Sequence, residues 1–397
     1  MNKRRENGTG HIYLKSNGKW GGMFPIGYNS QGKPRYTYFT AKSKQEVSSW
    51  LVKLQAEKAK GINIAPNKML VGEWLDYWYE NHCVNKVKDT TRADDESIIR
   101  NHLKPNFGRI KLSDLKGYQV QEVYNNMLKS GKMNSEQGGL SPKTIRNIHV
   151  VFHRALNQAC KSDLLIKNPL ISVTLPRVHK TPIEILTPEE QKALEQKCSN
   201  HLWGTAILLT LYSGMRLGEV LGLTWDDIDF KNGTIRINKQ LSRVKNFNPE
   251  IESKTILILR LETKTKSSNR IICIAPAVME KLKSYKTEQE ANRQKIKSVY
   301  NDLNMVFCRS DGWYIDPKTF GDFYTNTLKK AGVGHKTFHA LRHTFATRAL
   351  EAGTPPKVVS EILGHSSVQI TLDTYSHVSQ ELQSNFMQRI ADKFLVA

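Results

Sequence analysis

The sequence predicts a multidomain, mainly α-helical protein. It combines a small three-stranded β-sheet plus a helix at the N-terminus, an all-α domain in the middle, and a mixed, mostly α domain with a small β-sheet at the C-terminus. Three observations predict this fold class: strand-like runs with turn residues fill positions 10–40, helical periodicity begins near residue 68, and two breaks separate the segments. We expect domains at 1–62, 68–176 and 182–397, for which 397 residues suffice.

The N-terminal segment has three strand-like runs followed by a helix. The runs are 11–15, 19–26 and 35–39, and the helix is predicted over about 43–60. Residues 1–65 contain 12 Lys and Arg against 3 Asp and Glu, and Lys15, Lys19 and Arg35 lie at the ends of the strands. Either this is a solvated accessory domain, or its basic sheet lies in a DNA groove.

The middle segment follows a linker-like stretch at 61–67 and has a helical pattern. Ser141 and Pro142 are typical of a helix start, with serine as the cap and proline in the first turn. By composition alone, this all-α domain is equally consistent with a protein-interaction bundle.

The C-terminal segment begins after a second break at 176–182. Thr187 and Glu190 have the spacing of a capping box, which predicts a helix start. Most of the segment is helical, and strands are predicted at 234–237, 256–259 and 270–274.

Charge is the most informative feature of the composition. The formal net charge is +22 and the isoelectric point is about 9.7. Nucleic acid, an anionic membrane surface and an acidic protein are all possible partners, but the excess is spread along the chain rather than confined to one amphipathic helix. Nucleic acid is therefore the favoured partner.

Other features of the composition exclude several classes of protein. No apolar run approaches the ~20 residues that span a bilayer, so no membrane association is expected, and no apolar stretch follows the polar N-terminus as a secretory signal would require. The five cysteines are scattered singly, as is usual in a reducing compartment. We expect a cytoplasmic protein.

Four short segments of the C-terminal domain combine chemically active residues. They contain Arg216 with Glu219, His339 with Arg342, Gly364 with His365, and Tyr375. Taken alone, Arg216 and Glu219 are explained by an ordinary i,i+3 ion pair. His339 and Arg342 share one face of a predicted helix, and Gly364 is predicted to end a helix in the left-handed conformation.

These residue types suit attack on a phosphodiester. A guanidinium binds two phosphate oxygens and keeps its charge. Histidine transfers protons near neutral pH. A tyrosine hydroxyl has a reference pKa of ~10, so it needs a base or a phosphate held by cations before it becomes a nucleophile.

Together the segments resemble the tyrosine recombinase (phage integrase) family over essentially the whole chain. The resemblance rests on Arg216, His339-x-x-Arg342, Leu363-Gly364-His365 and Tyr375 in this order, supported by residues 215–229 and 339–347. It is greatest to integrases of conjugative transposons and prophages that carry an N-terminal arm-binding domain. It implies a site-specific DNA recombinase that integrates and excises a mobile element.

The resemblance also implies a role for each residue. Arg216, Arg342 and His365 hold the scissile phosphate, and Tyr375 attacks it to form a 3′-phosphotyrosine. His339 acts as general base, and Glu219 supports the site. Because the bond energy is kept in the phosphotyrosine, no metal, ATP or other cofactor is expected.

The family further places a catalytic lysine in the β-hairpin after the first arginine. Lys266 matches this position best, and Lys264 is the competitor. By this resemblance, the lysine donates a proton to the leaving 5′-oxygen.

The implied architecture has three DNA-contacting parts. Residues 1–62 resemble an arm-binding domain, 68–176 a core-binding domain and 182–397 the catalytic domain, so the expected partner is double-stranded DNA at core and arm sites. A homotetramer on DNA and an excisionase or DNA-bending helper are also implied. An apolar stripe in the final helix packs either on its own domain or on a neighbouring subunit: Leu382, Phe386, Ile390 and Phe394.

Three alternatives remain. A metal enzyme is one, because His335, His339 and His343 recur at a spacing of four. The others are a DNA-binding regulator or inactive relative, and a chromosome-dimer resolvase, although such resolvases generally lack an arm domain. One departure from the family pattern is the spacing of ten between His365 and Tyr375, where several relatives have nine.

Overall fold

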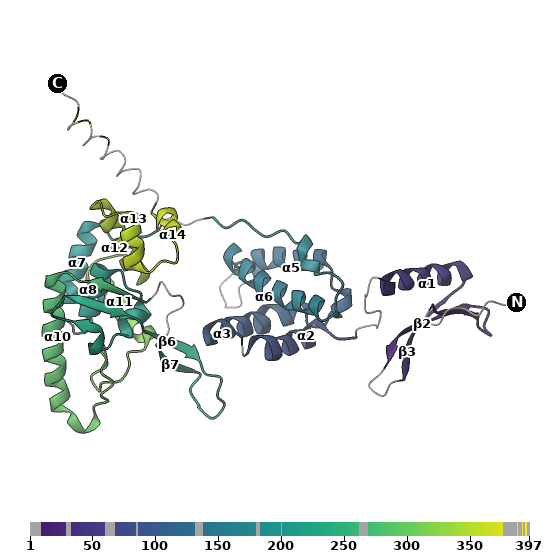
Figure 1. Ribbon diagram of the computed structural model, residues 1–397, viewed down its shortest axis with the longest axis horizontal. Coiled ribbons are helices and arrows are strands. Elements are labelled where there is room, and N and C mark those ends of the chain that lie inside the picture. Colours follow the sequence, from purple (N-terminus) through teal and green to yellow (C-terminus); the bar gives the residue numbers. More distant parts are fainter. Residues whose placement is uncertain are drawn as a thin grey trace. The chain divides into compact units, whose positions relative to one another are not determined.

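The computed structural model describes residues 9–28, 33–59, 68–84, 86–131, 138–179, 183–199, 201–261 and 269–375, together with Met387, Ala391 and Phe394. The chain divides into two compact units, Met1–His179 and Lys180–Ala397 (Figure 1). None of the helices in the described ranges has the length and apolar character that a membrane crossing requires.

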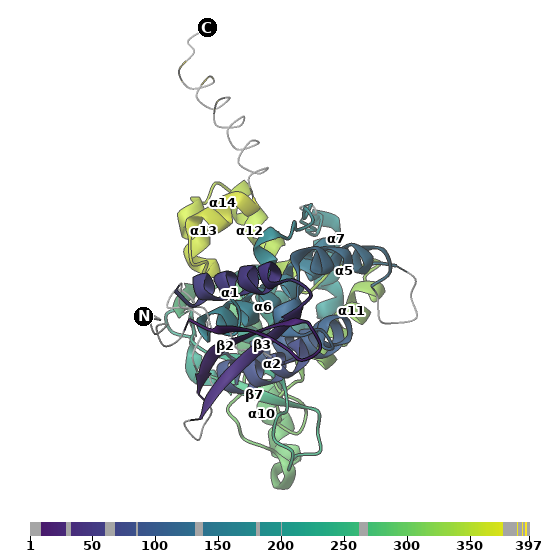
Figure 2. The same ribbon diagram turned by 90° about the vertical axis from the view of Figure 1, so that its right-hand side faces the viewer.

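The N-terminal part is an antiparallel sheet of three strands with one helix. Its elements are β1 (His11–Leu14), β2 (Trp20–Tyr28), β3 (Pro34–Ala41) and α1 (Lys44–Ala59), and β2 is the central strand. Gly22 lies opposite Phe39 in the register and faces Val47 and Trp50, so α1 covers that side of the sheet (Figure 2). The expected three strands and helix are present.

The second part of this unit is all-α, as expected. It consists of α2 (Val71–Trp78), α3 (Asp89–Ile98), α4 (Lys104–Phe107), α5 (Gly117–Ser130) and α6 (Pro142–Lys161), with π-helical turns at Tyr79–Cys83 and Ile99–Leu103 and 3₁₀ turns at Leu112–Asp114 and Pro169–Ser172. Ser141 caps α6 through its hydroxyl, as its sequence predicts. Apolar side chains of these helices form one core.

The C-terminal unit is mostly helical with two small antiparallel sheets. Its helices are α7 (Pro188–Cys198), α8 (Gly204–Ser213), α9 (Leu217–Leu221), α10 (Pro276–Lys295), α11 (Pro317–Lys330), α12 (His339–Glu351), α13 (Pro356–Leu363) and α14 (Val368–Thr374), with 3₁₀ turns at Trp225–Asp227 and Lys297–Val299. Helix α8 is apolar around nearly its whole circumference and lies at the centre of the core, where α7, α10 and α12 contact it.

Two strands of this unit were not predicted from the sequence. The three strands β4 (Ile228–Asp229), β5 (Thr234–Ile237) and β8 (Arg270–Cys273) form one sheet, and β6 (Gln240–Lys245) pairs with β7 (Thr255–Arg260) in a separate hairpin (Figure 1). The two-residue strand β4 was not predicted, and neither was β6. Its buried residues Leu241 and Val244 are three apart, so the alternation that marks a strand is missing.

Candidate active site

A tight turn between α8 and α9 places the first arginine. Gly214 ends α8 with φ +65°, and a Cβ atom there would lie 2.6 Å from both Leu363 and Phe345, so only glycine fits without a shift. Two residues later, Arg216 is the N-cap of α9. Its side chain remains partly exposed, as a phosphate ligand needs.

A buried carboxylate holds this arginine. Glu219, with a side chain 3% exposed, accepts hydrogen bonds from the backbone N–H of Arg216 at 2.9 Å and from its Nη1 at 2.7 Å. Arg270, at the start of β8, donates from Nη2 to the same carboxylate at 2.9 Å. Burial alone would raise the pKa of Glu219, but the hydrogen bonds and charges of Arg270 and Arg216 outweigh it and lower the pKa below its ordinary value.

The second arginine is held by backbone carbonyls. Arg342 is 2% exposed and donates from Nη1 to the Gly214 carbonyl and from Nη2 to the Leu363 carbonyl, each at 2.7 Å. Burial and then the charge of Arg216 lower the pKa of Arg342 to about 9, so it remains a cation at neutral pH. The turn after α8 therefore orients both arginines.

Two histidines lie within electrostatic range of these arginines. His365 follows Gly364, which ends α13 in the left-handed conformation as predicted, and its Nδ1 lies 2.8 Å from the hydroxyl of buried Thr371. His339 is the first residue of α12. Burial, and then the charges of nearby cationic side chains, lower the pKa of each histidine to about 4. Both imidazoles are neutral at pH 7.

Tyr375 lies at the C-terminus of α14 and is 2% exposed. Its ring packs among apolar residues of α12 and α13: Ala346, Leu350, Val359 and Leu363. Burial raises its pKa to about 12, against the opposing effect of Arg342. Its hydroxyl lies 2.7 Å from Nδ1 of His343.

The structure thus gathers most of the residues selected from the sequence. Helices α12, α13 and α14 contact one another in sequence order (Figures 1 and 2). At or near their ends they carry His339, Arg342, His365 and Tyr375. Lys266 and Lys264 lie outside the described residues, so their positions remain predictions. The same holds for Leu382, Phe386 and Ile390 of the final stripe.

Sequence reasoning missed two residues of the site. The sequence predicts Arg270 only as the start of a strand, although its position just after Lys264 and Lys266 is a usable signal. His343 was considered only as a metal ligand with His335 and His339. His335 precedes α12 and does not share its face, and within the described residues no group of three or more His, Cys, Asp or Glu side chains is arranged to hold a metal ion.

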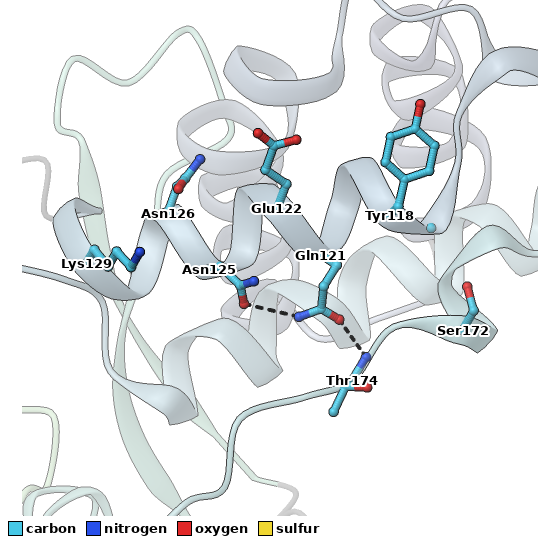
Figure 3. Close-up of a pocket in the computed structure, with 9 residues that line it drawn as sticks. Tyr118, Gln121, Glu122, Asn125, Asn126, Lys129, Ser172 and Thr174 are labelled. Carbon is cyan, nitrogen blue, oxygen red and sulfur yellow. Dashed lines mark hydrogen bonds between the residues drawn. The ribbon is translucent and has the colours of Figure 1, made fainter.

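A separate hollow of about 730 Å³ lies in the helical domain against α5 (Figure 3). Its walls carry amides, hydroxyls, a lysine and the carboxylate of Glu122. Gln121 accepts from the backbone N–H of Thr174 at 2.8 Å and donates to the Asn125 amide oxygen at 3.2 Å. Neither histidine nor cysteine lines it. Its polar side chains offer hydrogen-bond donors and acceptors to a bound polar group.

Comparison with known proteins places the chain in a family. The phage integrase family model matches residues 184–381, and a model of the phage integrase N-terminal SAM-like domain matches 70–128. A tyrosine recombinase XerC-like protein of Caldanaerobacter subterraneus is 31% identical over 93% of this chain and 95% of its own length. The chain belongs to the phage integrase family.

This integrase-family chain is also similar to transposon proteins. The transposase from transposon Tn916 of Enterococcus faecalis is 26% identical over 86% of this chain and 82% of its own length. The solved structure of the Tn1549 transposon integrase in complex with a circular intermediate DNA is 25% identical, with a TM-score of 0.65, over 81% of this chain and 100% of that one. The protein is a tyrosine-type, site-specific DNA recombinase.

Proposed function

We propose that this recombinase integrates and excises a mobile element by cleaving and rejoining DNA through Tyr375. One observation carries the proposal: two arginines and two neutral histidines lie together near the buried Tyr375. The carboxylate of Glu219 holds Arg216, and two backbone carbonyls hold Arg342. Such an arrangement binds a phosphodiester and stabilises the charge of a pentavalent transition state.

Each group has a task in this reaction. Arg216 and Arg342 bind the non-bridging phosphate oxygens. Glu219 holds the guanidinium of Arg216 in place through its hydrogen bond. With the Thr371 hydroxyl donating to Nδ1, the Nε2–H of His365 is free to donate to the same phosphate. His339, next to Arg342 and Arg216, offers a further donor.

The covalent step exchanges one phosphodiester for another. The Tyr375 oxygen bonds to phosphorus, the bond to the 5′-oxygen breaks, and the leaving oxygen takes a proton from the loop lysine, Lys266 or else Lys264. Rejoining reverses these events with a different 5′-hydroxyl. All the chemistry is assigned to side chains and DNA, with no cofactor.

DNA is the proposed partner along the whole chain. The basic sheet binds arm sites, the helical domain, with the polar hollow against α5, binds core sites, and four copies act together on two duplexes, with an excisionase or DNA-bending helper directing excision. The relatives support this assignment: one solved neighbour is a lambda integrase tetramer bound to a Holliday junction. The protein would act in the cytoplasm, with access to its DNA substrate.

The test is capture of the covalent intermediate. Wild type and Tyr375→Phe are incubated in EDTA with supercoiled plasmid carrying the joined ends of the element, then quenched with SDS. We expect protein-linked DNA from wild type only, because the variant lacks the nucleophile. An adduct formed by Tyr375→Phe, or an adduct that requires added metal, would refute the proposal. DNA binding without an adduct from wild type would favour a regulator instead.

A further inference from the structure

The hydroxyl of Tyr375 has a proton acceptor beside it that the family resemblance does not assign. Nδ1 of His343 lies 2.7 Å from the tyrosine oxygen, within the range required of a general base. Within the described residues, the Tyr375 hydroxyl makes one hydrogen bond to a side chain, and its partner is His343. The inference rests on the proposed function, because it takes Tyr375 as the nucleophile.

The other two histidines are engaged differently. Nδ1 of His365 is directed to Thr371 at 2.8 Å. The ring of His339 meets the ring of His343 edge to face, with centroids 4.7 Å apart, and is close enough to Arg342 and Arg216 to sense their charge. His339 therefore faces the arginines, and His343 stands between it and Tyr375.

The surroundings of His343 favour its neutral form. The groups that face it are Arg342 and His339 from its own helix and Tyr375 from the end of α14. Burial, and then Arg342, lower its pKa below the ordinary value of ~6.5. Tyr375 is fully protonated at pH 7 because its pKa is raised. In the tautomer that carries its hydrogen on Nε2, the neutral ring of His343 accepts this O–H through Nδ1. The pair is thus a protonated nucleophile and an unprotonated base.

We propose that His343, and not His339, accepts the phenolic proton when Tyr375 attacks the phosphate. The Tyr375 O–H bond breaks, its proton forms a bond to Nδ1 of His343, and the freed electron pair forms the bond from oxygen to phosphorus. His343 becomes an imidazolium, and the leaving 5′-oxygen receives its proton from the loop lysine. During rejoining, His343 returns the proton to the tyrosine.

The experiment measures single-turnover adduct formation by the full-length protein. Wild type, His343→Ala, His343→Gln, His339→Gln and Tyr375→Phe are compared on the plasmid with joined element ends, in EDTA, between pH 6 and 9.5. Loss of a general base should slow both His343 variants by about 10²–10⁴-fold at pH 7. Their rates should rise about tenfold per pH unit as phenolate forms, while wild type stays nearly flat. Added imidazole should restore part of the activity of His343→Ala.

Three readouts separate this role from others. Glutamine can accept a hydrogen bond from Tyr375 but not its proton, so a His343→Gln rate within about threefold of wild type would reduce His343 to a positioning residue and overturn the proposal. A steep alkaline profile in His339→Gln, and not in the His343 variants, would return the base to His339. Gel-shift affinity and thermal unfolding show whether each variant is folded. An adduct from Tyr375→Phe would instead refute the proposed function itself.

Discussion

At the level of single residues, the site is a cluster of positive charge around one negative group. Arg216 and Arg270 share the carboxylate of Glu219, while Arg342 is satisfied by carbonyl oxygens that carry no full charge. One carboxylate cannot neutralise three guanidinium groups. The remaining positive charge attracts a phosphodiester anion. Burial first, and this positive charge second, explain why the nearby histidines resist protonation.

That resistance predicts a pH dependence of stability. His339 and His365 have pKa values of about 4 in the fold and ~6.5 when unfolded. Between these values the unfolded chain binds more protons, so the free energy of unfolding must fall as pH drops from ~6.5 towards 4. For His365 we expect a loss of about 1 kcal/mol between pH 7 and 5, after discounting for solvent.

Urea unfolding at pH 7, 6 and 5 checks this expectation. His365→Gln is the control, because it removes one of the titrating groups and should lose less stability on acidification than wild type. Equal losses in the two proteins would show that His365 titrates normally in the fold.

At the level of elements, the turn between α8 and α9 fixes the site. Gly214→Ala should lower the free energy of unfolding by about 2–4 kcal/mol, from left-handed strain plus the collision with Leu363 and Phe345. Adduct formation should fall as well, since the Gly214 carbonyl orients Arg342. Chemical denaturation and adduct trapping measure the two effects.

The matched control is Gly353→Ala. Gly353 also has a left-handed φ, +83°, but no atom lies within 4 Å of its added Cβ. It should lose only the strain energy, about 1–2 kcal/mol, with adduct formation unchanged. If the two variants behaved alike, the contact with Leu363 and Phe345 would be unimportant.

A second element, the connection between β7 and β8, carries the candidate general acid. Arg270, the first residue of β8, is bound to Glu219, so the chain re-enters the sheet beside the site. At ~3.5 Å per residue, the chain length limits Lys266 to about 14 Å from residue 270 and Lys264 to about 21 Å. Chain length therefore excludes neither lysine from the site beside Arg270.

Substrate chemistry distinguishes the two lysines. Alanine at the catalytic lysine should slow adduct formation by about 10²–10⁴-fold on normal DNA, and a sulfur in place of the bridging 5′-oxygen should restore the rate, because a thiolate leaves without a proton. Lys266→Ala is expected to behave in this way and Lys264→Ala to remain near wild type. If Lys264→Ala were slowed and then rescued, and Lys266→Ala were not, the role would belong to Lys264. If the sulfur-substituted DNA rescued neither variant, neither lysine would be the general acid.

At the scale of the whole molecule, positive charge is distributed over regions that can each contact DNA. In the N-terminal sheet, α1 covers one face and leaves the other with Tyr13, Tyr38 and Lys15, whose Nζ donates to Thr40 at 2.7 Å. Lys19 is exposed, and the side chain of Arg35 lies outside the described residues. The uncovered face is the one we propose for arm-site DNA.

Two charge-matched variants of the full-length protein test this face. Lys15→Ala removes a cation from the uncovered face, and Lys53→Ala removes an exposed one from α1. We expect Lys15→Ala to weaken binding to the element's end sequences and to reduce the slope of log affinity against log salt by about 1, as loss of one phosphate contact does. Lys53→Ala should leave the slope unchanged. Equal effects would place the DNA elsewhere.

Local sequence determined much of this protein. The capping box at Thr187 and Glu190, the serine cap of α6 and the left-handed Gly364 all follow from interactions within a few residues, and the structure contains each of them. The motif residues were also recognisable, since the chemistry of phosphate attack restricts the side chains that can serve. The unpredicted β6 shows the limit, because its burial pattern is set by what packs against it.

Only the tertiary structure decided how the motif residues are engaged. Arg342 is held by carbonyls 128 and 21 residues away, Arg270 meets Glu219 across 51 residues, and His343 meets Tyr375 across 32. No local pattern encodes such contacts, because they arise when α12 packs against α8 and α13, and α13 against β8. The sequence therefore determined which groups are available, and packing decided which histidine lies beside the nucleophile.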